Sequence, residues 1–179
     1  GDLGNAYWLH RVRLSGAAVA LQQQEAAGAR EQLDALAAEA DQPASTGDLR
    51  WDLPMLVELH LLRARLALAV GELDAAQQAT AAALGAGRDE AADLVSLLPH
   101  LYLRLLHTLG QVAQRRGDIP AARRHYLDAV EAIEAQRALL PVEDLRAACP
   151  ADKGAIYADL GLSLLASPEP APGEVAEAF

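Results

Sequence analysis

The chain has 179 residues, enough to bury a substantial core within one domain. It is 52% hydrophobic but only 4% aromatic, so its apolar content is mostly Ala and Leu, and this predicts an all-α protein. A formal net charge of −10 disfavours binding to nucleic acid or to an anionic membrane surface.

The sequence also predicts a cytoplasmic protein without a membrane span. Five polar residues or prolines interrupt the longest apolar candidate, 53–71, namely Pro54, Glu58, His60, Arg63 and Arg65. The sequence does not show the pattern of a secretory signal, a positively charged start followed by an apolar core. The single Cys149 excludes an internal disulfide and fits a reducing compartment. The chain starts at Gly1 and not at Met, so we expect a piece of a longer protein.

The first half of the chain predicts a helical pair and then a loop. Helices are expected over 6–27 and 29–40, with Gly28 as the break between them. The second of these helices has one apolar face, made by Leu33, Leu36, Ala37 and Ala40. The segment 41–52 is a polar loop rich in turn formers, and Asp52 is the expected N-cap of the next helix.

A second helical pair follows that loop. The turn 71–74 separates its two helices, and a second turn at 85–87 ends the pair. A short helix is expected over 89–98, and Pro99 must kink or restart it. In the second helix of this pair, three positions match three later ones, Ala76, Thr80 and Ala83 corresponding to Ala122, Tyr126 and Ala129.

The clearest helical pair covers 99–116 and 119–139. Gly117 suits the left-handed conformation that ends a helix, and Asp118 is a good N-cap for the next. The pattern resembles the tetratricopeptide repeat (TPR), whose signature is L-G-x-x-Y, a Gly-Asp turn, A-x-x-x-F and a closing Ala. The matching residues are Leu109, Gly110, Gly117, Asp118, Ala121, Ala122, Tyr126 and Ala129. Ala113 and Glu134 depart from it, since the family prefers an aromatic residue and Pro there.

The TPR resemblance implies an α-solenoid of about three helical hairpins plus a C-terminal helix. One domain would cover 1–166, with hairpins at about 6–40, 54–85 and 99–139 and a helical segment at 143–166. The glycine spacings are 43 and 46 residues, from Gly28 to Gly71 and on to Gly117. An ordinary TPR recurs every ~34 residues, so this chain resembles the divergent arrays of large bacterial regulatory proteins.

The stretch 129–165 carries a second resemblance. A long helix with an Ile-Glu-x-x-Arg core is followed by a Leu-Arg pair, an Asp-Lys pair and a final helix with Tyr that ends in Leu-Leu. These are Ile133, Glu134, Arg137, Leu145, Arg146, Asp152, Lys153, Tyr157, Leu164 and Leu165. The order is similar to the segment before the caspase-like CHAT domain of bacterial TPR-CHAT proteins, departing at Cys149-Pro150. It implies a protease domain beyond Phe179, with 167–179 as a Pro-rich acidic linker.

The two resemblances imply a non-catalytic module for protein–protein interaction and regulation, as the TPR arm of a CHAT-type protease. One alternative is the TPR sensor domain of a large nucleotide-binding transcriptional regulator, and another is a stand-alone TPR adaptor. Terminal helices of such arrays are often unpaired, so self-association near Tyr7, Trp8 or 160–165 stays open. The sequence gives little support to an enzyme in its own right.

Residues that could carry chemistry are isolated from the partners they would need. Cys149 has no His nearer than His125 and no Gly-rich nucleophile loop, which favours a structural thiol. Three further histidines lack the i, i+4 companions of a helical zinc site, so neither a metal nor a cofactor is expected: His60, His100 and His107. No paired carboxylates in an apolar setting and no phosphate-binding loop are present.

The TPR resemblance also places a binding groove, because the first helix of each pair lines the concave face of such arrays. Counting from Leu103 and from Val57 predicts six partner-binding residues, Arg65, Arg104, His107, Gln111, Gln114 and Arg115. The same count adds four neighbours, Glu58, Leu61, Leu68 and Ala69. The arginines suit an acidic peptide or an acidic segment of the parent chain. Alternatively, they solubilise this face or pair with Glu.

Overall fold

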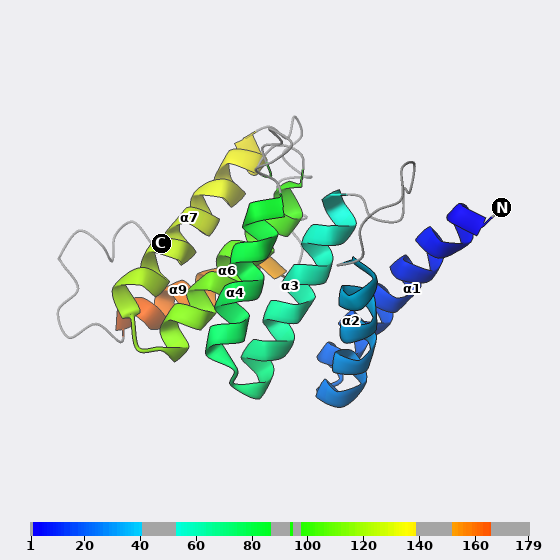
Figure 1. Cartoon of the computed structure of the whole chain (residues 1–179). Helices are drawn as coiled ribbons and strands as arrows, with labels where there is room; N and C mark the ends of the chain where they lie inside the picture. The colour runs from blue at the N-terminus through cyan, green and yellow to red at the C-terminus, as the bar shows by residue number, and fades with distance from the viewer. Residues whose placement is uncertain (1, 41–52, 87–93, 95–97, 139–151, 166–179) are drawn as a thin grey trace. The chain divides into compact units, whose positions relative to one another are not determined.

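The fold is all-helical throughout the described residues, as the composition predicts (Figure 1). A computed structural model describes residues 2–40, 53–86, 94, 98–138 and 152–165. Its helices are α1 Asp2–Gln22, α2 Ala26–Ala40, α3 Leu53–Val70, α4 Leu73–Ala86, α6 Pro99–Arg115, α7 Ile119–Ala138 and α9 Asp152–Leu165. None of these helices is long and apolar enough to cross a lipid bilayer.

The helices fall into two compact units. The first unit, Gly1–Leu101, contains α1 to α4, and the second, Tyr102–Phe179, contains α7, α9 and all but the first turn of α6. In the first unit α1 packs on α2 and α3 packs on α4, while α3 also contacts both helices of the preceding pair. In the second unit α7 packs on α9.

The three helical hairpins turn in the same way. One residue in each turn has a positive φ, 62° at Gln24, 84° at Gly71 and 80° at Gly117. The next backbone N–H donates to the carbonyl five residues earlier, over 2.8 Å from Glu25 to Ala20, 2.8 Å from Glu72 to Ala67 and 3.0 Å from Asp118 to Ala113. This is the Schellman arrangement that ends many helices. Asp118 is an N-cap, as predicted, because its Oδ1 accepts a hydrogen bond from the Ala121 N–H at 3.0 Å.

The predicted helix break at Gly28 is wrong. Helix α1 ends at Gln22, and Gly28 lies inside α2. The left-handed residue of the first turn is Gln24 instead, where a glycine would avoid the steric cost of that conformation. The turns are therefore 47 residues apart from Gln24 to Gly71 and 46 apart from Gly71 to Gly117, so the spacing is more regular than the glycines indicate.

Burial repeats with the same spacing. The residues five, nine and twelve positions after each left-handed residue are all 0% exposed, namely Ala29, Leu33, Leu36, Ala76, Thr80, Ala83, Ala122, Tyr126 and Ala129. Each hairpin also has a buried small residue seven positions before its left-handed residue, namely Ala17, Ala64 or Gly110. This agrees with the predicted match between the second and third hairpins and extends the match to the first.

Each unit has its own core. In the first unit, Leu14, Ala17 and Ala20 of α1 pack with residues of α2 and α3, which include Ala29, Leu33, Leu36, Met55, Leu59, Leu62 and Leu66. In the second unit α9 supplies Ile156, Leu160 and Leu164 to clusters with α6 and α7, which include Leu103, Leu106, Ala122, Tyr126, Ala129 and Ile133. Burying each Leu, Ile or Met side chain of these clusters contributes about 1.5–3 kcal/mol.

Some sequence-based expectations fall on residues outside the described part of the chain. These are the Asp52 cap, the Cys149 thiol, the tail 167–179 and most of the short helix expected over 89–98. The C-terminal helical segment expected over 143–166 is described from Asp152 to Leu165.

Candidate functional site

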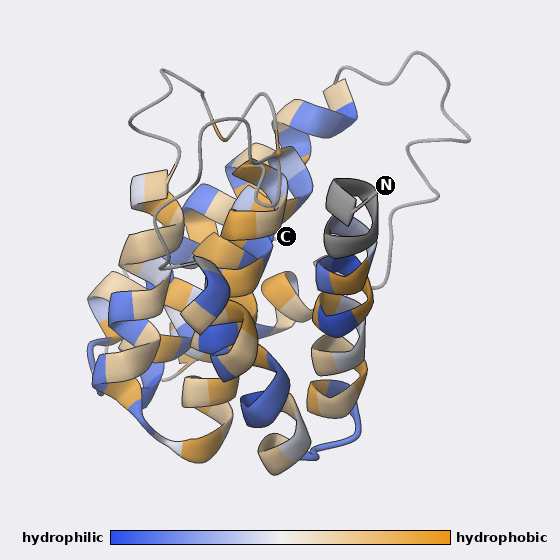
Figure 2. Ribbon diagram, turned by 45° about the vertical axis from the view of Figure 1, so that its right-hand side comes forward, coloured by the Kyte–Doolittle hydropathy of each residue, from blue (hydrophilic) through white to orange (hydrophobic). Residues whose placement is uncertain are grey.

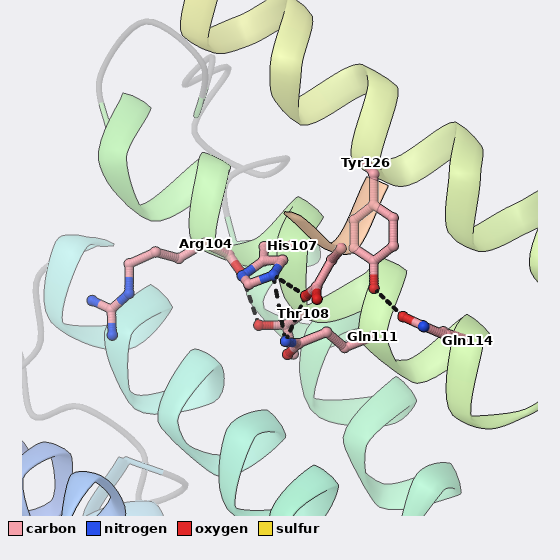
Figure 3. Close-up of polar contacts among 7 residues, drawn as sticks. Arg104, His107, Thr108, Gln111, Gln114 and Tyr126 are labelled. Carbon is pink, nitrogen blue, oxygen red and sulfur yellow. Dashed lines mark hydrogen bonds and ion pairs between the residues drawn. The ribbon is translucent and has the colours of Figure 1, made fainter. Parts of the chain in front are cut away.

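Three of the six predicted partner-binding residues take part in a polar cluster inside the second unit (Figure 3). His107 Nε2 lies 2.7 Å from Asp159 Oδ2, which joins α6 to α9. Gln111, one helical turn after His107, donates from Nε2 to the same carboxylate oxygen at 3.2 Å. Gln114 Oε1 accepts the hydroxyl proton of Tyr126 at 2.8 Å, which joins α6 to α7.

Tyr126 lies next to this cluster. Its ring centroid is 5.9 Å from that of His107, with the two planes tilted by 53°. Burial raises the pKa of the Tyr126 phenol, and the negative charge of Asp159 raises it further. The phenol is therefore a hydrogen-bond donor at neutral pH. Together these contacts give His107, Gln111 and Gln114 a role in packing α6 against α7 and α9.

The three predicted arginines are placed differently. The Arg104 backbone carbonyl accepts the Thr108 hydroxyl proton at 2.8 Å, while its guanidinium points away from the His107 cluster (Figure 3). Arg115 is exposed in the last turn of α6, where a cation complements the helix dipole. Arg65 is half-buried on α3 in the first unit. Partner binding by these residues stays a prediction.

The predicted groove on α3 contains side chains that cannot line an open surface. Leu61 is 0% exposed and Leu68 is 7% exposed, so both belong to the interior. His125, next to Tyr126, is half-buried, and its pKa is lowered by burial and by the neighbouring Arg124. Counting from the motif therefore included two buried leucines of α3 among the residues of an open groove.

The His107 cluster has no nucleophile for acyl or phosphoryl transfer among the hydroxyls beside it. Thr108 donates to a helix carbonyl, and Tyr126 donates to Gln114. A nucleophile would have to give its proton to the imidazole, within hydrogen-bond distance. Among the described residues, no group of three or more His, Cys, Asp or Glu is placed to hold a metal ion. The contacts of the His107 cluster pack α6 against α7 and α9.

A second polar joint connects α7 to α9. Glu134 Oε1 accepts hydrogen bonds from the Tyr157 hydroxyl at 2.7 Å and from Arg137, three residues later in α7, at 2.9 Å. Burial and the Glu134 carboxylate raise the pKa of Tyr157. Ile133, beside Glu134, is buried against Ile156 of α9. Four residues of the CHAT-linked resemblance thus meet at one joint.

A third joint connects α1 to α2 in the first unit, and sequence reasoning missed it. His10, only 1% exposed, has its Nε2 2.6 Å from Glu39 Oε2, and Arg13 donates to Glu39 Oε1 at 2.9 Å. Burial alone would raise the pKa of Glu39, but the hydrogen bonds from His10 and Arg13 outweigh it, so that pKa is lowered. His10 and Glu39 lie 29 residues apart, so no local motif could reveal this contact.

The first unit also has a pocket of about 290 Å³ over α3, between α2 and α4. Its lining mixes charges of both signs with alanines, including Arg30, Asp34, His60, Arg63, Glu72 and Ala79. Arg30 donates to Glu72 at 2.9 Å across it. This volume is at the lower end for small-molecule sites, so it suits one or two side chains of a partner. None of the residues predicted from α3 for the groove is among those that line this pocket.

Comparison of the chain with protein-family models, with curated proteins and with solved structures found no match.

Proposed function

We propose that this chain is a non-catalytic helical-repeat module of the TPR type that binds a protein partner and regulates a larger protein. The observation that carries the proposal is the repetition of one turn and one burial pattern in three hairpins at 46–47-residue spacing. Repeats of this kind stack into extended surfaces suited to holding peptides and protein segments. The three polar joints support it too, because each fixes helices in place and none arranges a reactive centre.

The parent protein we propose is a CHAT-type, caspase-like protease of which this chain is the TPR arm. Four residues of the CHAT-linked motif support this, because they take part in the contact between α7 and α9, namely Ile133, Glu134, Arg137 and Tyr157. That shared contact is a physical reason for these residues to occur together in the motif. Sequencing the parent reading frame on both sides of residues 1–179 tests it. A downstream α/β domain with a His after one strand and a Cys after a later strand is expected. An upstream ATPase domain would assign the chain to a transcriptional regulator instead.

The partner segment we propose is acidic and meets Arg104 and Arg115. A binding assay with fluorescein-labelled decapeptides, one set rich in Asp and Glu and one neutral set of equal length, tests this. The variant Arg104→Gln/Arg115→Gln removes two charges without touching the His107 cluster. Loss of charge-assisted hydrogen bonds should weaken acidic-peptide binding about tenfold.

The matched control is Arg124→Gln, which removes an exposed charge on α7. It should leave acidic-peptide binding unchanged. If the double variant binds as tightly as this control, Arg104 and Arg115 do not contact the partner. If neutral peptides bind as well as acidic ones, the partner is not selected by charge.

A further inference from the structure

Helix α1 exposes a row of apolar side chains along one face. Trp8 is 67% exposed, Val12 is 66% exposed and Val19 is 48% exposed, and the exposed Ser15 lies between them. Steps of four, three and four residues place these side chains on one face of a helix. Figure 2 shows hydrophobic residues recurring along α1 between hydrophilic ones. Apolar residues scattered over a surface need no explanation, but such a row does.

The equivalent row of α3 is an interface. Counted back from the left-handed residue of each turn, Trp8, Val12, Ser15 and Val19 correspond to Met55, Leu59, Leu62 and Leu66. These α3 residues are 0%, 0%, 0% and 5% exposed. They are also the four residues of α3 in the core cluster that it forms with α1 and α2. The face by which α3 packs on the preceding hairpin is therefore the face that α1 leaves exposed.

The exposed row is separate from the face that α1 uses within its own hairpin. Leu14, Ala17 and Ala20 of α1 are at most 7% exposed and pack with Ala29, Leu33 and Leu36 of α2. Helix α3 likewise has two contact faces, because it packs on α4 as well as on the preceding pair. Helix α1 thus has the apolar positions by which α3 contacts its preceding hairpin, and the described residues leave these positions of α1 exposed.

We propose that the face formed by Trp8, Val12, Ser15 and Val19 docks a helical hairpin of the same repeat class. That hairpin would present to α1 what α1 and α2 present to α3, aliphatic and small side chains such as Leu14, Ala17, Leu33 and Leu36. The inference goes beyond the proposed function, since it concerns how the array extends and not which peptide it binds. It depends on the turn spacing and on no arginine of the predicted groove, so the two proposals can fail independently.

A tandem chain tests this docking. The tandem joins residues 1–52 to residues 6–179, so it is longer than the original chain by 47 residues, the spacing from Gln24 to Gly71. The second copy then begins at Ala6, which follows Asp52 directly, as Leu53 does in the original chain. The inner copy of α1 then has a hairpin before it, and the outer copy does not. The tandem contains Trp8 and Trp51 twice each, so changing both copies of Trp51 and one copy of Trp8 to Phe leaves a single tryptophan to observe. The inner Trp8 should emit at shorter wavelength and resist acrylamide quenching, while the outer Trp8 should behave as in the original chain.

Substitution of the same face gives a second readout. Val12→Glu/Val19→Glu in the inner copy should lower the urea midpoint by about 1 M or more, because two carboxylates would be buried without partners. In the outer copy the same pair should change the midpoint little, since both valines are exposed there. Equal Trp8 quenching in the two copies, or equal effects of the two substitutions, would overturn the proposal.

The original chain distinguishes a second copy from a hairpin partner. Sedimentation at several concentrations should show no dimer that depends on this face. A dimer abolished by Val12→Glu/Val19→Glu and retained in the control Val70→Glu would overturn the proposal, since a second copy would then cover the face. Val70 is 41% exposed on α3, which makes it a suitable control.

Discussion

Gly110 of α6 is in direct contact with the ring of Tyr126 of α7. The ring occupies the space that the Cβ of any other residue at position 110 would need. A Cβ at Gly110 would lie 2.8 Å from the ring Cζ and closer still to two other ring atoms. Real Cβ atoms do not approach other atoms so closely. The helices approach each other at this position, and the buried Tyr126 hydroxyl reaches Gln114. The Gly-Tyr pair of the repeat motif therefore has a steric reason.

Replacing Gly110 by Ala should destabilise the protein by about 1–3 kcal/mol through overpacking. Urea unfolding followed by circular dichroism measures this. Gly154→Ala in α9 is the matched control, because nothing lies within 4 Å of a Cβ there. It should stabilise the protein by up to about 1 kcal/mol through helix propensity. Adding Tyr126→Leu to Gly110→Ala should recover part of the loss, and the absence of any recovery would contradict the steric account.

Replacing Gln24 by Gly should stabilise the first hairpin by about 1 kcal/mol. The positive φ of Gln24 costs an L-residue roughly 1–2 kcal/mol, and glycine avoids that cost. Thermal unfolding compares this variant with Ala35→Gly, an exposed position in the middle of α2 where glycine should cost about 1 kcal/mol. If both glycines destabilise equally, Gln24 is not held in the left-handed conformation.

Glu134 and Tyr157 should show coupled contributions to stability. Their hydrogen bond of 2.7 Å connects α7 to α9, so a double-mutant cycle of Glu134→Ala and Tyr157→Phe should give a coupling free energy of about 0.5–1.5 kcal/mol. Urea unfolding of the four proteins measures it. The cycle of Glu131→Ala with Tyr157→Phe is the control, because Glu131 is exposed one turn earlier, and it should be additive within ~0.5 kcal/mol.

Stability should fall at alkaline pH through Tyr126. Its pKa in the folded protein is raised above the unfolded value of 10.0, so its contribution is complete below pH 10 and is lost as the pH rises towards the folded pKa. The slope for one such group approaches about 1.4 kcal/mol per pH unit. Tyr126→Phe should be less stable at pH 8, having lost the bond to Gln114. Urea unfolding at pH 8 to 11.5 should show this deficit shrinking, and a constant deficit would contradict the prediction. Tyr157, whose pKa is also raised, contributes equally in both proteins.

The sequence predicted those features of the fold that depend on local chemistry. Ala and Leu content indicated helices, and the Gly-Asp pair at 117–118 indicated a left-handed turn followed by an N-cap, which the structure contains. The first turn was misplaced by four residues because Gln24 adopts a conformation for which glycine is the usual signal. Glycine content is thus an incomplete guide to turns, since tertiary packing can impose positive φ on another residue.

The candidate site was predictable in part. Counting along the helix grouped His107, Gln111 and Gln114, and in the structure all three contact a neighbouring helix, either α7 or α9. Their partners could not be predicted, since Asp159 is 52 residues from His107 and its approach depends on how α9 packs. The burial of Leu61 and Leu68 could not be predicted either. Periodicity identifies an apolar face of a helix, but it does not tell whether another helix covers that face.

The bond between His10 and Glu39 closes the first hairpin far from its bend at Gln24. A hairpin held at its bend and again at His10 and Glu39 cannot fray one turn at a time between these points. We therefore expect the backbone amides from His10 to Glu39 to exchange with solvent in a single cooperative step, with this part of both helices opening together.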